Sequence, residues 1–380
     1  MTSPTSINGT VKEGFEPISE AFANNFAEHG EIGASFCVYQ DGEKVVDLWG
    51  GSMDKARTKP WQESTLVNVW STTKGMMALC IARLNDQGLL DNQRNVVDYW
   101  PEFGENGKQD VTVAQLFSHQ AGLCGTIEPA TEELLLNTEA LAEVLAAQAP
   151  SWPIGSRSGY HALSIGPLGD ALVERVTGKT VGEYFRDEIA GPLDIDFHIG
   201  LAPENDARVA TIVHDGKPLN GGIEHHNEIQ RMAMDNLPLV PEIANKPEWR
   251  RQGTPSAAGH GNARGIAKIY GALATNRSID GAELVSKEKL DAATTIQIEN
   301  EDLVIGLPIC WGVGFAINKG LGVYGPNEES FGHHGWGGSF GFADPQKKLG
   351  VAYAMNFMRE VDVAPDPRLV GLIGALYSVA

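Results

Sequence analysis

Basic residues are scarce in this 380-residue chain, and so are long apolar runs. Only 29 Lys and Arg stand against 49 Asp and Glu, which gives a formal net charge of −20. A field of that sign repels phosphate backbones and anionic lipids. No apolar stretch approaches the roughly 20 residues that a membrane-spanning helix needs. We therefore expect neither nucleic acid nor a membrane surface as a partner.

Cysteine is also scarce, and motifs for a metal or a nucleotide are missing. The four cysteines, Cys37, Cys80, Cys124 and Cys310, are widely separated and stand in apolar surroundings. They are expected to be buried thiols rather than a disulfide framework or a zinc cluster. There is no phosphate-binding loop, no His-Glu-x-x-His and no close pair of Cys-x-x-Cys motifs. We expect no metal and no organic cofactor.

The first residues lack the pattern of an export signal. MTSPTSINGT has no basic segment followed by an apolar one, and a secretory signal requires both. We therefore expect a cytoplasmic protein, and the sequence predicts no oligomeric state.

Strand-like segments gather near the two ends of the chain, and helical patterns fill the middle. Asp41-Gly42 separates two β-rich runs and predicts a hairpin. Further strands are expected within 311–318, 339–345 and 349–357, and helices over 11–29, 131–148, 262–275 and 367–380. This order predicts an α+β fold, with one antiparallel sheet flanked by terminal helices. Residues 1–95 and 297–380 would form the α/β lobe, and 96–296 an inserted, mostly helical lobe.

A Ser-x-x-Lys motif occurs three times, in different surroundings. Ser52 to Lys55 lies in a polar turn, and Ser286 to Lys289 opens a charged helix, where Ser286 is expected to be an N-cap. Only Ser71 to Lys74 stands at the start of a helix that is apolar nearly all round.

That position suits a nucleophile. The positive end of a helix dipole favours negative charge on the Ser71 oxygen, and Lys74 lies on the same helix face. Loss of hydration in an apolar site lowers the pKa of a lysine toward that of a useful base. The alternative is an ordinary serine N-cap followed by a lysine that reaches solvent.

A second serine lies in the sequence Gly337-Gly338-Ser339-Phe340-Gly341, which matches Gly-x-Ser-x-Gly. The nucleophile elbow of α/β-hydrolases needs a following helix, and a histidine later in the chain. Here a β-like run follows, and no histidine occurs after His334. These glycines are instead typical of a tight turn between strands, at a close approach of backbone to ligand.

Three motifs together resemble the serine β-lactamases and penicillin-binding proteins, in particular class C enzymes and the related family VIII carboxylesterases. They are STTK at 71–74, Tyr160-His161-Ala162 in place of Tyr-x-Asn, and His333-His334-Gly335 in place of Lys-Thr-Gly. LFSHQAGL at 116–123 and AGPLDID at 190–196 are similar to the esterase branch. The resemblance covers nearly the whole chain and implies a β-lactamase/transpeptidase-like fold.

The resemblance also implies roles. Ser71 would be the nucleophile, with Lys74 and Tyr160 as its proton-transfer pair, and which of the two is the base stays open. Backbone N–H groups of Ser71 and Trp336 would form the oxyanion hole. The residues expected to contact substrate are His161, His333, His334, Gly335 and Trp336.

Departures from the family pattern narrow the expected substrate. Ala162 lacks the amide of the usual asparagine, and His333 and His334 replace a firm cation and a hydroxyl. Both changes weaken the binding of an anionic β-lactam or D-alanyl group, while Trp336 adds apolar bulk. We expect a carboxylesterase that acts on a small uncharged ester, with acyl transfer to an alcohol as a second activity. A β-lactamase or D-amino peptidase is the enzymatic alternative, and a ligand-binding pseudoenzyme is the non-catalytic one.

Overall fold

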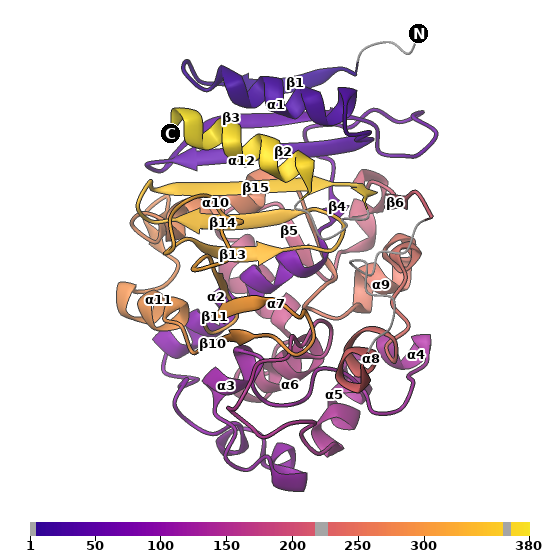
Figure 1. The fold of residues 1–380 in the computed structure, drawn as a ribbon, viewed down its shortest axis with the longest axis vertical. Coiled ribbons are helices and arrows are strands. Elements are labelled where there is room, and N and C mark those ends of the chain that lie inside the picture. The colour runs from indigo at the N-terminus through magenta and orange to yellow at the C-terminus, as the bar shows by residue number, and fades with distance from the viewer. Residues whose placement is uncertain (1–4, 217–226, 360–365) are drawn as a thin grey trace.

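The fold is built on one antiparallel sheet of nine strands (Figure 1). The computed structural model describes residues 5–216, 227–359 and 366–380. In spatial order the strands are β1 (Ile7–Val11), β3 (Glu43–Gly51), β2 (Gly33–Gln40), β15 (Leu349–Met355), β14 (Phe340–Asp344), β13 (Phe331–His334), β12 (Ala316–Ile317), β11 (Pro308–Trp311) and β10 (Ile298–Glu301). The two ends of the chain meet where β2 pairs with β15. The predicted fold class is therefore confirmed.

The hairpin predicted at Asp41-Gly42 joins β2 to β3. Both turn residues have positive φ, 50° for Asp41 and 81° for Gly42. A two-residue turn of this kind matches the right-handed twist of the strands that it connects.

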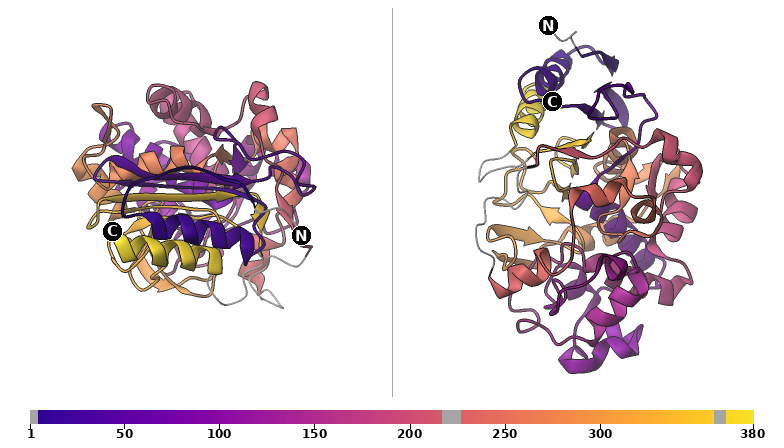
Figure 2. Two further views of the ribbon diagram at one scale, coloured as in Figure 1. Left: turned by 90° about the horizontal axis from the view of Figure 1, so that it is seen from above. Right: turned by 90° about the vertical axis from the view of Figure 1, so that its right-hand side faces the viewer.

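Helices cover both faces of the sheet. On one face α1 (Glu16–Ala27) and α12 (Pro367–Val379) lie side by side, as Figure 2 shows. On the opposite face α10 (Ala263–Leu273) packs against β2, β14 and β15, and α2 (Thr73–Asp86) contacts β13. The terminal helices therefore flank the sheet, as the sequence predicts. The first helix begins five residues later than expected, after β1 has paired with β3.

Helix α2 is almost entirely buried, as its apolar sequence predicts. Gly75 lets it approach α10 closely, because a Cβ at this position would lie 1.9 Å from the Tyr270 Oη. The helix proper begins at Thr73, whereas the sequence predicted a start at Ser71. Ser71 lies instead in a 3₁₀ turn, Trp70–Thr72, which Thr72 N–H closes by donating to Val69 O at 3.1 Å.

Further helices and short strands complete the described part of the fold. The helices are α3 (Val113–Phe117), α4 (Glu132–Leu135), α5 (Thr138–Ala147), α6 (Ile165–Thr177), α7 (Val181–Phe185), α8 (Glu228–Met234), α9 (Pro247–Gln252) and α11 (Lys287–Thr294). The short strands are β4 (Val67–Asn68), β5 (Phe197–Ile199), β6 (Val213–His214), β7 (Gly259–Gly261), β8 (Ser278–Ile279), β9 (Ala282–Glu283) and β16 (Phe357–Met358). The helix predicted over 131–148 is divided into α4 and α5, with Asn137 as the N-cap of α5.

The predicted division into two lobes stays a prediction. Helix α10 lies within 96–296 by number, yet it packs on the sheet because its buried face meets β2, β14 and β15. The four cysteines are free and buried, as expected. Among the described residues, the search for a helix long and apolar enough to cross a membrane finds none.

Candidate active site

Ser71 sits in a turn held by its neighbours at both ends. Val69 N–H donates to Gly259 O at 2.9 Å, on strand β7. Trp70 has a positive φ of 49°, and this left-handed conformation is unfavourable for residues other than glycine. Its ring is held between Trp249 at 5.9 Å and Trp336 at 5.1 Å, measured between ring centroids. Aromatic packing therefore fixes the turn that carries the Ser71 side chain.

Lys74 is the buried neighbour of that hydroxyl. Its Nζ lies 3.0 Å from Ser71 Oγ, 2.6 Å from Ala162 O and 3.1 Å from Ser256 O. These three partners are uncharged oxygens, and the side chain is almost fully buried. Burial lowers the pKa of Lys74 well below its ordinary value, because a charged amine loses its hydration there.

Tyr160 approaches Ser71 from the loop before α6. Its hydroxyl interacts with the Ser71 side chain, and burial raises the pKa of Tyr160. The Lys74 Nζ lies 4.9 Å from the centroid of the Tyr160 ring. The structure therefore brings Ser71, Lys74 and Tyr160 together, with Lys74 in hydrogen-bond contact with the Ser71 hydroxyl.

His333 and His334 point to opposite faces of the sheet, because they are successive residues of β13. The His333 ring lies 5.8 Å from that of Tyr160, and its Nδ1 is 2.8 Å from its neighbour's carbonyl, His334 O. Burial lowers the pKa of His333 well below its ordinary value. His334 instead stacks on Tyr324 at 4.8 Å. The expectation that His334 contacts substrate is not supported.

His161 is enclosed by backbone hydrogen-bond partners. It is fully buried, its Nδ1 lies 2.6 Å from Gly159 O, and its Nε2 accepts a hydrogen bond from Leu123 N–H at 3.1 Å. Burial lowers its pKa to about 4, so the ring is neutral. Because both ring nitrogens already have backbone partners, His161 supports the local structure, and the expected substrate contact is not supported.

The turn that follows β13 lies against the turn of Ser71. A Cβ added to Gly335 would lie 2.2 Å from Val69 O, so only glycine permits this approach. Gly335 N–H donates to Ser339 O at 2.7 Å and closes the turn. The half-buried Trp336 ring packs on Trp70. The structure therefore places Gly335 and Trp336 beside the turn of Ser71.

The other two Ser-x-x-Lys motifs lie elsewhere. Ser286 is the N-cap of α11, as predicted, and Ser52 pairs with Pro60 in an isolated β-bridge.

A family model described as Beta-lactamase matches residues 18–375, nearly the whole chain. The chain belongs to the beta-lactamase family.

Relatives within this family span almost the full length. A crystal structure of a family VIII carboxylesterase is 43% identical, with a TM-score of 0.93, and covers 99% of this chain and 100% of that one. A penicillin-binding protein homologue from Caulobacter crescentus is 40% identical, with a TM-score of 0.92 and the same coverage. The esterase/beta-lactamase LipL of Mycobacterium tuberculosis is 35% identical over 98% of this chain and 87% of its own length.

Sequence reasoning missed Asp302, which supports Tyr160 in this beta-lactamase-family site. Its carboxylate accepts hydrogen bonds from Tyr160 N–H at 2.9 Å, Ser158 Oγ at 2.7 Å and Trp311 Nε1 at 3.2 Å. The Trp311 ring stacks on that of Tyr160 at 5.5 Å and 4°. Asp302 and Trp311 thereby hold the Tyr160 ring and backbone. A single Asp in an unremarkable loop carries no local pattern that could have revealed this.

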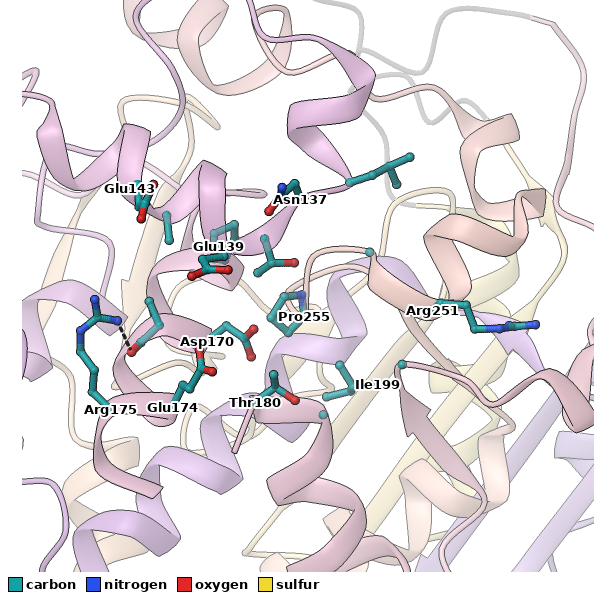
Figure 3. Close-up of a pocket in the computed structure, with 18 of the residues that line it drawn as sticks. Asn137, Glu139, Glu143, Asp170, Glu174, Arg175, Thr180, Ile199, Arg251 and Pro255 are labelled. Atoms are coloured by element: carbon teal, nitrogen blue, oxygen red, sulfur yellow. Dashed lines mark hydrogen bonds between the residues drawn. The ribbon is translucent and has the colours of Figure 1, made fainter. Parts of the chain in front are cut away.

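A separate polar cavity of about 360 Å³ lies between α5, α6 and the loop of Pro255 (Figure 3). Its lining includes two arginines, Arg175 and Arg251, and four carboxylates, Glu139, Glu143, Asp170 and Glu174. Burial raises the pKa of Asp170 to about 6. The side chains of Ser71, Lys74 and Tyr160 are not part of this lining.

Proposed function

We propose that this chain is a serine carboxylesterase that hydrolyses small uncharged esters through an acyl-enzyme on Ser71. One observation carries the proposal: Lys74 Nζ lies 3.0 Å from Ser71 Oγ and also donates to two backbone carbonyls. Relatives at 43% and 35% identity, described as a carboxylesterase and an esterase/beta-lactamase, support the same reaction.

Lys74 is the better candidate for the base. A neutral amine has two N–H bonds and one lone pair. The carbonyls of Ala162 and Ser256 take the two N–H bonds, which leaves the lone pair directed at the Ser71 hydroxyl. Burial favours this neutral form. Tyr160, whose pKa burial raises, stays protonated and is suited to donate.

The proton movements then balance. As Ser71 Oγ attacks the ester carbonyl, its proton passes to Lys74 Nζ. When the C–O bond of the ester breaks, Tyr160 gives its proton to the leaving alkoxide, and Lys74 returns the first proton to the phenolate. The alcohol departs with one proton gained, and Ser71 carries the acyl group. Water or an alcohol attacks that group by the same steps in reverse, which gives hydrolysis or acyl transfer.

The tetrahedral intermediate needs donors for its oxyanion. We assign this role to the backbone N–H groups of Ser71 and Trp336, because the two turns that carry them lie against each other at Val69 and Gly335. Each such donor is typically worth about 3–4 kcal/mol of transition-state stabilisation.

The surroundings favour an ester over an anionic lactam. Burial keeps His333 neutral, so it supplies no cation for a substrate carboxylate. Ala162 has no side-chain amide, and its carbonyl is occupied by Lys74. The half-buried Trp336 adds apolar surface beside Ser71. A role for His333, Gly335 and Trp336 in substrate contact remains part of the proposal. The cytoplasmic location and the absence of nucleic-acid partners stay predictions.

The proposal is tested by comparing kcat/KM for p-nitrophenyl butyrate, nitrocefin and a D-alanyl-D-alanine peptide. We expect the ester to exceed the other two by at least on the order of a hundredfold. Ser71→Ala should abolish turnover of all three. A preference for nitrocefin or for the peptide would contradict the ester assignment while keeping the nucleophile, and equal ester turnover by Ser71→Ala would contradict both.

A further inference from the structure

We propose that Ser339 is a positioning residue that joins the two halves of the oxyanion hole. This inference rests on the proposed function, because it concerns the donors of that reaction. Ser339 lies at the end of the turn that carries Trp336, 270 positions along the chain from Val69, its hydrogen-bond partner in the turn of Ser71.

The contacts of the Ser339 hydroxyl are short and fully buried. Its Oγ donates to Val69 O at 2.8 Å and lies 3.1 Å from Thr72 Oγ1. Neither Ser339 nor Thr72 is exposed to solvent. Val69 and Thr72 stand on either side of Ser71 and hold its turn, since Thr72 N–H donates to the same Val69 carbonyl. One hydroxyl therefore touches both ends of the nucleophile turn.

Hydrogen counting fixes the direction of this chain of bonds. A serine hydroxyl has one hydrogen, and the bond to Val69 O uses it. The Thr72 hydroxyl must therefore donate to Ser339 Oγ. The result is a directed series from Thr72 to Ser339 to Val69, and such series strengthen one another in a buried setting.

The backbone of Ser339 fixes the turn of Trp336, which carries the other donor of the oxyanion hole. The Ser339 carbonyl accepts a hydrogen bond from Gly335 N–H at 2.7 Å, and Trp336 lies within the turn that this bond closes. A Cβ added to Gly335 would lie 2.1 Å from Ser339 Oγ. The side chain of Ser339 thus holds the Ser71 turn, and its main chain holds the Trp336 turn. Ser339 therefore links the two donors by hydrogen bonds, in addition to the packing of Trp336 on Trp70.

The same geometry excludes Ser339 as a nucleophile. Its hydroxyl is buried, its hydrogen is taken by a backbone carbonyl, and its neighbour Thr72 Oγ1 is not a base. We call the link that Ser339 forms between the turns of Ser71 and Trp336 the clamp. The Gly-x-Ser-x-Gly sequence is therefore part of this clamp and not a nucleophile elbow.

The test compares Ser339→Ala with wild type on p-nitrophenyl butyrate and on the matching thionoester. An oxyanion hole stabilises a developing oxygen anion by hydrogen bonds, whereas the sulfur anion of a thionoester accepts them weakly. We expect kcat on the oxoester to fall about tenfold to a hundredfold, less than the loss of a donor itself, with little change in KM. The thionoester rate should change much less, so the ratio of the two rates falls. Thr72→Val should show the same change to a smaller degree.

Ser164→Ala is the matched control. Ser164 is also fully buried, and its hydroxyl donates to Leu123 O at 2.6 Å rather than to the turn of Ser71 or of Trp336. Ser164→Ala should lower the thermal stability about as much as Ser339→Ala does. It should leave the ratio of the oxoester rate to the thionoester rate at the wild-type value. An unchanged kcat in Ser339→Ala, or equal losses on both substrates, would overturn the clamp. A wild type that does not turn over the oxoester, or that is not acylated on Ser71, would instead reject the proposed function, and the clamp with it.

Discussion

Two buried cations show how differently the molecule treats positive charge. Lys74 and Arg368 are both almost completely removed from solvent. Lys74 donates to three uncharged oxygens, and burial lowers its pKa well below the ordinary value. Arg368 lies between two carboxylates, Glu31 and Asp366.

Arg368 joins the terminal helix to the rest of the structure. Its Nη1 lies 2.7 Å from Glu31 Oε2, and its Nη2 lies 2.6 Å from Asp366 Oδ2 and 2.8 Å from Gly337 O. Burial alone would lower the pKa of Arg368, but Glu31 and Asp366 outweigh it and raise the pKa. The guanidinium therefore stays charged.

The difference follows from the partners rather than from the depth of burial. A buried charge persists where carboxylates compensate the loss of hydration, and a buried lysine without them shifts toward its neutral form. The first arrangement produces a structural link, and the second suits the base that we propose. Removing either cation should therefore have opposite consequences for activity and for stability.

The largest effect is expected from Lys74→Met. Without the base, kcat/KM for p-nitrophenyl butyrate should fall by about a thousandfold, while thermal stability is kept because a desolvated amine is removed. Lys108→Met is the matched control, since Lys108 is also buried and donates to the carbonyls of Glu105 and Gln148. It should keep its activity, with a change in stability similar to that of Lys74→Met, because both variants remove a buried amine that donates to two backbone carbonyls. More than a tenth of wild-type activity in Lys74→Met would show that Lys74 is not the base.

Arg368→Met should act mainly on stability. It leaves Glu31 and Asp366 buried without their partner, and breaking such a pair typically costs about 3–5 kcal/mol. The measurement is urea unfolding followed by circular dichroism. Loss of less than about 1 kcal/mol would mean that the carboxylates relax to water or take up protons, and the contrast with Lys74 would then fail.

The stability difference between wild type and Lys74→Met should depend on pH. The folded chain binds a proton at Lys74 less readily than the unfolded chain, so the unfolded state holds the extra proton below 10.5, the ordinary pKa. The free energy of unfolding of wild type, relative to the variant, therefore rises with pH. The rise begins at the lowered pKa of folded Lys74, ends near 10.5, and has a slope of at most about 1.4 kcal/mol per pH unit. Parallel pH profiles, measured by urea unfolding, would contradict a lowered pKa.

Ester hydrolysis should follow the same titration. If neutral Lys74 is the base, kcat/KM should rise with pH through its lowered pKa and reach a plateau before 10.5. Stopped-flow measurement of the acylation rate between about pH 5 and about pH 10 would detect this rise. A rate that rises only near the ordinary lysine pKa would speak against this assignment.

The smallest effect is expected for an exposed cation. Lys12 lies 2.6 Å from Glu43 on the surface, where 56% of its side chain is exposed. Lys12→Met should change the free energy of unfolding by less than about 1 kcal/mol and leave kcat/KM unchanged. A loss comparable to that of Arg368→Met would show that burial is not what separates the two ion pairs.

Much of the fold follows from local patterns. The Asp41-Gly42 hairpin, the buried helix after Ser71 and the terminal helix depend on turn chemistry and periodicity, which short segments display. The spacing of Ser71 and Lys74 on one turn predicted their contact for the same reason. The structure brings them together with Tyr160, although their catalytic roles stay proposals.

What the sequence could not reveal depends on distant partners or on side-chain direction. Asp302 is 142 residues from Tyr160, and Arg368 is 337 residues from Glu31, so no local pattern links them. The motif His333-His334-Gly335 predicted that this segment lies at the site. It could not predict toward which face of β13 the side chain of His334 points. His161 has the position of a motif residue but both ring nitrogens face backbone.

The central claim is that Ser71 is the nucleophile. The most direct measurement is intact-protein mass spectrometry after treatment with a fluorophosphonate, on wild type and on Ser71→Ala, with peptide mapping of the adduct. One adduct on the wild type, mapped to the peptide of residues 71–74 and absent from Ser71→Ala, is the predicted result. An adduct that persists in Ser71→Ala, or that maps to Ser339, would contradict it.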